Sequence, residues 1–294
     1  MTRRAVMSAF KSILVPVEDE MSAAIPLDTA LRLAGRFSAH VTALHVRADP
    51  TNAVPLVGEG MSGAMVEEMI GIAETQGAQR AKLARAAFDT ALARNGAPLA
   101  DAPPVEGLSA EWIEVVGREE DVITWRGRVS DLVVFGHPGG EAEVSSLITL
   151  NTALMACGRP LLLCPAEPAP LPGSNVCIAW NGSAEAARAV GFAMPFLKGA
   201  ASVTILTVAE HAGGPAPAGD LETYLAWNGI AAGTTVIQAP SSHAGEELVR
   251  QTRKVGADLL VMGAYTHSRL RQLILGGVTR HVISHAPLHV LMCH

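Results

Sequence analysis

The stretch that decides the fold lies near the end of the sequence and reads DLLVMGAYTHSRLRQLILGGV, residues 258–278. A continuous apolar run between Asp258 and Gly263 is too short for a helix and too continuous for a half-exposed strand, so we predict a buried strand. A polar loop follows, and apolar residues then return at three- and four-residue spacing before Gly276 and Gly277. A strand, a glycine-bearing loop and a helix start form a geometry that binds phosphate, because free helical N–H groups and the helix dipole both favour an anion.

The same pattern occurs earlier in the chain, as DLVVFG at residues 131–136. Before and after a proline-rich stretch, apolar runs alternate with helix-forming segments in the same order, and paired signatures at four or more places indicate a tandem duplication. The alternation predicts right-handed crossovers and an open parallel sheet with helices on both faces in each half. We therefore expect an α/β protein with one domain at 1–165, a linker at 166–174 and a second domain at 175–294.

Composition narrows the possible partners. The chain has 294 residues, of which 49% are hydrophobic, and this is enough to build two cores. A net charge of -6 without a dense Lys/Arg cluster argues against binding nucleic acid or an anionic membrane. No apolar run approaches the roughly 20 residues of a membrane helix, and no signal-peptide pattern is present, so we expect a cytoplasmic protein.

Four cysteines and four tryptophans are spread along the chain. Cys157, Cys164, Cys177 and Cys293 lack C-x-x-C spacing, so we expect reduced core thiols rather than disulfides or a zinc site. We also expect the tryptophans to serve mainly in packing; they are Trp112, Trp125, Trp180 and Trp227.

The candidate ligand site is the crevice beyond the carboxyl ends of the strands in the second half. Ala179 and Asn181 end the first strand there, Val208 lies on the second, and Met262 ends the fourth. We expect Val208 and Met262 to sandwich a flat ring while Asn181 forms hydrogen bonds with its edge. Backbone N–H groups after the fourth strand could then bind phosphates, so the pattern fits an adenine nucleotide.

These residues resemble those of a universal stress protein domain, and the whole chain resembles a tandem member of that family. The family's nucleotide motif is Gly, two residues, Gly, nine residues, Gly, then Ser or Thr. This sequence has Gly263, Thr266, Gly276 and Gly277 in those four places. By this resemblance the positions that contact ATP are Ala179, Asn181, Val208, Met262, Gly263, Thr266, Gly276, Gly277 and Val278. Arg269 is added as an electrostatic contact to a phosphate.

Two departures from the motif concern the second half. Thr266 carries a Cβ where the family has glycine, and Gly277 lacks the usual hydroxyl. The first half departs further, because Thr149 and Leu150 occupy the later motif places. We expect an empty or altered site in the first half.

The resemblance implies two Rossmann-like sheets of strand order 3-2-1-4-5 that pair through their last strands, here residues 160–164 and 288–292. It also implies a stress-response protein that binds ATP, with or without Mg²⁺, and hydrolyses it little or not at all; a further homodimer remains open. One alternative is a family member that binds no nucleotide and acts as an interaction scaffold or small-molecule sensor. Another is an enzyme that uses His267 or Ser268.

Two other clusters of residues could bind a metal ion, but each has a simpler explanation. His281 and His285 could share a helix face and hold a metal, but Pro287 separates them from His289, so we expect surface histidines and no metal site. The run Glu18, Asp19 and Glu20 could attract a cation, but we expect a solvated strand end.

Overall fold

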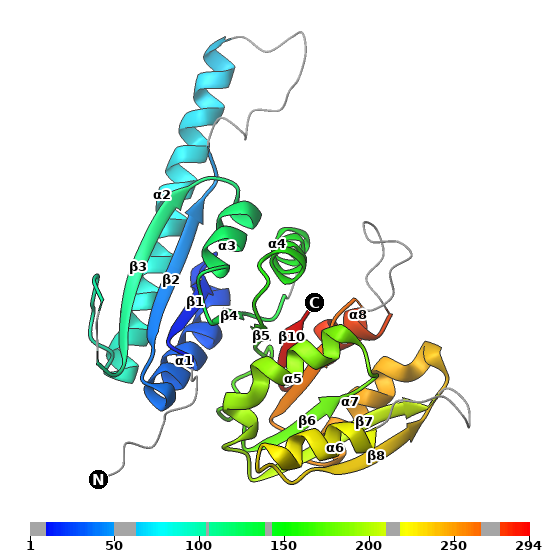
Figure 1. Ribbon diagram of the computed structural model, residues 1–294. Helices are drawn as coiled ribbons and strands as arrows, with labels where there is room; N and C mark the ends of the chain where they lie inside the picture. Colours follow the sequence, from blue (N-terminus) through cyan, green and yellow to red (C-terminus); the bar gives the residue numbers. More distant parts are fainter. Residues whose placement is uncertain (1–9, 50–62, 104–105, 139–142, 210–217, 266–276) are drawn as a thin grey trace. The chain divides into compact units, whose positions relative to one another are not determined.

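The computed structural model describes residues 10–49, 63–103, 106–138, 143–209, 218–265 and 277–294 (Figure 1). These residues form two compact units, each described below by itself. Among the described residues, the N-terminal unit lies within Lys11–Val134 and Val144–Cys157, and the C-terminal unit lies within 135–138 and Gly158–His294, with Phe10 and Glu143.

The N-terminal unit is built on parallel strands in the order β3-β2-β1-β4. The strands are β1 (Ser12–Pro16), β2 (His40–Arg47), β3 (Ser109–Val116) and β4 (Leu132–Phe135). Residues of β1 and β4 such as Ile13 and Leu132 are fully buried, as expected for central parallel strands covered on both faces.

The helices of this unit are α1 (Glu20–Phe37), α2 (Gly63–Asn95), α3 (Glu119–Gly127) and α4 (Glu143–Ala156). Asp19 caps α1 because its side chain accepts a hydrogen bond of 2.8 Å from Ser22 N, so the acidic run after β1 is the start of a helix. The 33 residues of α2 extend beyond the ends of β2 and β3 (Figure 1).

The C-terminal unit has strands in the order β5-β10-β9-β6-β7-β8. They are β5 (Leu161–Leu163), β6 (Asn175–Ala179), β7 (Ser202–Ala209), β8 (Gly233–Gln238), β9 (Leu259–Gly263) and β10 (His289–Cys293). The five strands from the second half of the sequence have the predicted order 3-2-1-4-5. One detail differs from two separate five-stranded parallel sheets: β5 pairs antiparallel with β10, with Leu163 opposite Val290. This is the expected pairing of the last strands.

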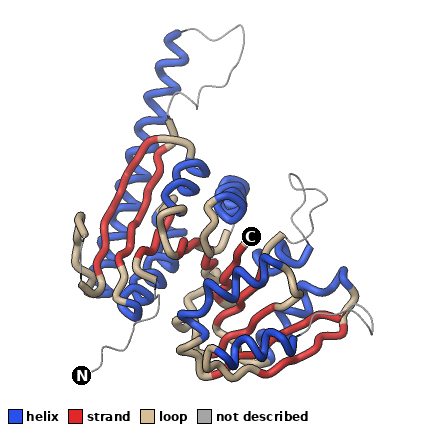
Figure 2. Tube along the Cα trace, in the orientation of Figure 1, coloured by secondary structure: helices blue, strands red, loops and turns tan. Residues whose placement is uncertain are grey.

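The helices of the C-terminal unit are α5 (Ala184–Leu197), α6 (Ala218–Trp227), α7 (Ala244–Lys254) and α8 (Gly277–His285), and a 3-10 turn, Ser241–His243, precedes α7. Figure 2 shows the alternation of strands and helices along the chain. Helix α5 packs against β9 and β10, and α7 packs against α8. These contacts place the starts of α5 and α8 near the carboxyl ends of the central strands.

Several predictions from residue type can be compared with the fold. All four cysteines are buried, as expected for core thiols, and the structure pairs none of them in a disulfide. The packing role assigned to the tryptophans is wrong for Trp125 and Trp227, which are 63% and 87% exposed. Both lie near the ends of short helices, α3 and α6. No helix within the described ranges is long and apolar enough to cross a membrane.

Candidate functional site

The carboxyl ends of β6, β7 and β9 lie side by side at one edge of the C-terminal sheet. Ala179 stands opposite Leu206 of β7 and Met262 of β9. Val208 is therefore two residues past Leu206 along β7, and Gly263 directly follows Met262. The strand register thus brings these predicted site residues to a common edge.

Val208 and Met262 differ in accessibility. Met262 is only 3% exposed and belongs to the core, whereas Val208 is partly exposed. Of the two side chains expected to sandwich a ring, only Val208 offers surface without a rearrangement.

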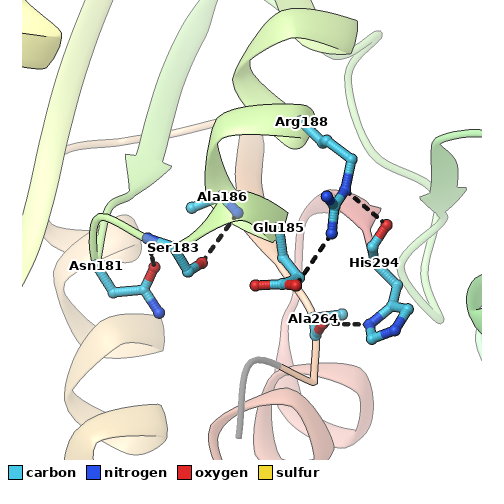
Figure 3. Close-up of polar contacts among 7 residues, drawn as sticks. All are labelled: Asn181, Ser183, Glu185, Ala186, Arg188, Ala264 and His294. Atoms are coloured by element: carbon cyan, nitrogen blue, oxygen red, sulfur yellow. Dashed lines mark hydrogen bonds and ion pairs between the residues drawn. The ribbon is translucent and has the colours of Figure 1, made fainter. Parts of the chain in front are cut away.

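Asn181 lies in the exposed turn between β6 and α5 (Figure 3). Its Oδ1 accepts a hydrogen bond of 3.1 Å from Ser183 N, and Gly182 between them has a φ of 73°, which favours glycine. Ser183 in turn caps α5, because its Oγ accepts a hydrogen bond of 3.1 Å from Ala186 N. The amide of Asn181 is therefore held at the edge by the same turn that starts α5.

Gly263 has a structural reason to be glycine. A Cβ at this position would lie 2.5 Å from Ala186 N and 2.8 Å from Glu185 Cβ, closer than real Cβ contacts come. The end of β9 thus passes directly against the first turn of α5. Sequence reasoning assigned Gly263 to a ligand, but this close approach to α5 alone accounts for the absence of a side chain.

Helix α8 begins at Gly277, which is exposed and has no atom of the described residues within 4 Å of the place a Cβ would occupy. Beneath it, a Cβ on Gly245 of α7 would lie 3.2 Å from Val278 Cα and 2.8 Å from His281 Cβ, so α7 supports the start of α8 closely. The first N–H groups of a helix have no partner within the helix, and the helix dipole favours an anion there. Thr266, Arg269 and Gly276 lie outside the described residues, as do the alternative catalytic residues His267 and Ser268.

Known proteins resemble the region that contains this site. Residues 229–294, from the approach to β8 through β10, match the model of the universal stress protein family. A universal stress protein of Synechocystis is 25% identical over 241 residues, which is 80% of each chain. The chain is related to the universal stress protein family.

Solved universal stress proteins share the fold along nearly the whole chain. One from Archaeoglobus fulgidus superposes with a TM-score of 0.63 at 16% identity, covering 96% of this chain and 95% of its own. A putative universal stress protein from Pseudomonas aeruginosa gives a TM-score of 0.56 at 15% identity, covering 97% and 93%. Both halves of the chain therefore have counterparts in universal stress proteins of known structure.

A second cluster of polar contacts, which the sequence did not suggest, lies beside the predicted site (Figure 3). Arg188 of α5 donates to Glu185 at 3.0 Å and to the backbone oxygen of His294 at 2.9 Å. The ring Nδ1 of His294 lies 3.1 Å from the carbonyl oxygen of Ala264, to which it donates. These bonds tie the start of α5 to the ends of β9 and β10. Only the three-residue spacing of Glu185 and Arg188 on one helix could have indicated part of this cluster from the sequence.

Trp180 follows β6 at the same edge. Its side chain is partly exposed, but the indole Nε1 is buried and has no hydrogen-bond acceptor among the described residues. Buried N–H donors are normally paired. The indole N–H is therefore a donor that a ligand acceptor at this edge could satisfy only if the surrounding side chains move.

In the first half, the sequence suggested that the acidic run after β1 is a solvated strand end, and the structure shows that Glu18 is not. Glu18 accepts a hydrogen bond of 2.6 Å from Ser146 Oγ of α4, and burial raises its pKa. Burial, with the charges of Glu18 and Glu120, raises the pKa of Glu119 at the start of α3 to about 8. The prediction failed because these carboxyl groups are distant in sequence and meet only in the fold.

The motif positions Thr149 and Leu150 in the first half lie inside α4, and both are buried. Side chains from the middle of a helix do not form a phosphate loop, since the backbone N–H groups there are bonded to the preceding turn. The first half of the chain therefore differs from the universal stress protein motif in backbone structure as well as in sequence.

His281 and His285 share a face of α8, with their rings stacked at a centroid distance of 4.3 Å. His289 lies on β10 instead and is buried. In the part of the chain that the structure describes, no three His, Cys, Asp or Glu side chains are grouped so that they could hold a metal ion.

Proposed function

We propose that the C-terminal unit binds an adenine nucleotide, ATP in the first instance, with the base at the carboxyl ends of β6, β7 and β9 and the phosphates at the start of α8. The observation that carries this proposal is the start of α8, where no atom of the described residues lies within 4 Å of a Cβ position on Gly277. The N–H groups of Gly277 and Val278 are then approachable by an anion. Thr266, Arg269 and Gly276, which precede Gly277 in the sequence, would contribute to phosphate binding.

The strand ends supply groups suited to a base. Val208 offers partly exposed apolar surface, Asn181 an amide that can both donate and accept, and Trp180 a buried N–H donor without an acceptor among the described residues. A purine has a flat apolar face and both donors and acceptors on its edge, so this combination favours it over a purely aliphatic ligand.

We further propose a binding role in the stress response rather than catalysis. The sequence has no G-x-x-x-x-G-K-[ST] loop, and no side chain at the described edge is placed as a general base for water. Mg²⁺ would accompany ATP through the phosphates. Hydrolysis should therefore be slow, and the proposed location is the cytoplasm.

Isothermal titration calorimetry with ATP, in the presence and absence of Mg²⁺, tests the proposal. Gly277→Glu adds a carboxylate at the start of α8 where the structure leaves room, so it should fold and weaken ATP binding by about tenfold or more. Gly191→Glu is the matched control, because it adds the same charge at an exposed position in the interior of α5, where no atom of the described residues lies within 4 Å of the added Cβ, and it should leave binding unchanged.

The two alternative functions, a scaffold or small-molecule sensor and an enzyme, predict different results. If the wild-type protein binds no adenine nucleotide, the scaffold or small-molecule-sensor alternative is favoured. If phosphate release is brisk and is abolished by His267→Ala, the protein is an enzyme and the binding-only proposal is wrong.

A further inference from the structure

Helix α2 is packed along only half of its length. Its buried residues all lie from Ala81 onward, where it contacts α1, β2 and β3; they are Ala81, Ala84, Phe88, Ala91 and Leu92. No residue from Gly63 to Arg80 is buried. Figure 1 shows this first half of α2 extending past the sheet.

This projecting half is nevertheless apolar on one side. Val66, Ile70 and Ala73 continue, at three- and four-residue spacing, the same stripe that is buried from Ala81. Ile72 beside the stripe is 51% exposed. A solvated helix end has no need of an apolar stripe, so this one is suited to contact another surface.

The projecting half is also acidic. Residues 63–79 contain three carboxylates, Glu67, Glu68 and Glu74, all exposed, and no Lys or Arg. Two such segments facing each other would bring like charges together, which is unfavourable. The surface that fits residues 63–79, called here the acidic arm, is therefore apolar with a basic border.

The same unit carries a surface of that kind at the ends of α3 and α4. Arg128 Nε donates to the carbonyl oxygen of Ala156 at 3.3 Å, which brings the two helix ends together. The α3–α4 surface is formed by Trp125, Arg126, Arg128, Val129 and Met155. Trp125 is 63% exposed, Val129 77% and Met155 36%, and both arginines are exposed.

The composition of the α3–α4 surface is typical of an interface. Trp, Met and Arg are the residue types enriched where proteins bind one another, and Trp and Arg are common among the residues that contribute most to binding. Helix α4 carries no charged residue between Val144 and Ala156, so the charged groups on this surface at the helix ends are those of Arg126 and Arg128. The surface is thus basic where the acidic arm is negative.

We propose that the acidic arm of one copy of the protein binds the α3–α4 surface of a second copy. Each copy carries both surfaces, and their apolar areas and opposite charges are complementary. The contact joins two different surfaces. Two copies can therefore form it twice, as a dimer, or several copies can form it in succession, as a larger oligomer. It involves only the N-terminal unit and is independent of nucleotide binding in the C-terminal unit.

Sedimentation velocity over a range of protein concentrations tests this with a charge exchange. Glu67→Arg with Glu68→Arg makes both surfaces basic, and Arg126→Glu with Arg128→Glu makes the α3–α4 surface acidic. Each variant alone should associate about tenfold more weakly than the wild type. An equimolar mixture of the two should recover association, because the basic arm of the first now meets the acidic surface of the second.

Recovery in the mixture separates a specific contact from a folding defect, and circular dichroism of each variant checks its fold. Glu106→Arg and Arg253→Glu, exposed charges that belong to neither surface, form the control pair and should change nothing. The proposal is overturned if the wild type stays monomeric at every concentration, or if the mixture associates no better than its components.

Discussion

Asp131 and Asp258 make the same contact in the two halves of the chain: each carboxylate accepts hydrogen bonds from backbone N–H groups where the first strand of its half begins. Asp131 Oδ2 lies 2.7 Å from Lys11 N and 3.0 Å from Ser12 N. Asp258 Oδ2 lies 2.9 Å from Asn175 N. The tandem relation between the halves therefore extends from the order of elements to individual hydrogen bonds.

This contact predicts the effect of removing the charge of Asp258. Its two oxygens also accept from Gly173 N at 2.7 Å and from Ser174 N at 3.0 and 3.1 Å, so Asp258→Asn leaves several N–H groups with fewer acceptors. We expect the free energy of unfolding to fall by about 1–3 kcal/mol, measured by chemical denaturation. The exposed Asp101→Asn should stay within about 0.5 kcal/mol of the wild type. If Asp258→Asn and Asp101→Asn gave the same denaturation curve, the structural role of Asp258 would be contradicted.

The close approach at Gly263 predicts a separate effect on stability. Gly263→Ala forces the end of β9 away from the backbone of α5, so we expect a loss of about 1–3 kcal/mol in unfolding free energy even without ligand. Gly233→Ala, where nothing lies within 4 Å of the added Cβ, should be close to neutral. If Gly263→Ala is as stable as Gly233→Ala, glycine is required there by a ligand rather than by α5.

Glu119 predicts a dependence of stability on pH. Its pKa in the folded protein is about 8 against an ordinary 4.5, so the folded state keeps a proton that the unfolded state loses. The contribution to stability is thus fully present below the ordinary pKa and is lost as the pH rises through about 8. Thermal melts from roughly pH 5 to roughly pH 9 should show Glu119→Gln gaining stability relative to the wild type as the pH rises.

Two further variants check the cause of that shift. Glu18→Gln removes a charge that raises the Glu119 pKa, so in this variant the loss of stability that comes from Glu119 should be smaller and should be complete at a lower pH than in the wild type. The exposed Glu106→Gln should leave the pH profile of the wild type unchanged. If the melting temperature of Glu119→Gln changed with pH in parallel with that of the wild type, Glu119 would not hold a proton in the folded protein above its ordinary pKa.

The cysteines predict how the native protein reacts with thiol reagents. All four are free and buried, and burial raises the pKa of Cys177 to about 12, so little thiolate is available. We expect negligible reaction with Ellman's reagent in buffer and reaction of all four thiols after denaturation. Rapid reaction of a native thiol would mean that its surroundings open readily.

The sequence indicated the alternation of strands and helices, the repeat and the edge at which Ala179, Val208 and Met262 meet, because hydrophobic periodicity and strand-end position are local signals. It did not indicate that Met262 is buried or that Gly263 touches α5, since both follow from tertiary packing. The pairing of Glu18 with Ser146 joins residues far apart in the chain, and no local pattern predicts it. Exposure of Trp125 was missed for the same reason: residue type suggests burial, and only the fold shows which face remains open.

The location of the nucleotide is tested most directly by photo-crosslinking with 8-azido-ATP, followed by mass spectrometry of the labelled peptides. Label should appear in peptides that contain Asn181, Val208 or Met262, should be displaced by unlabelled ATP, and should be lost in Gly277→Glu but kept in Gly191→Glu. Label confined to residues 11–134, or label that unlabelled ATP does not displace, would contradict an adenine nucleotide site at the carboxyl ends of β6, β7 and β9.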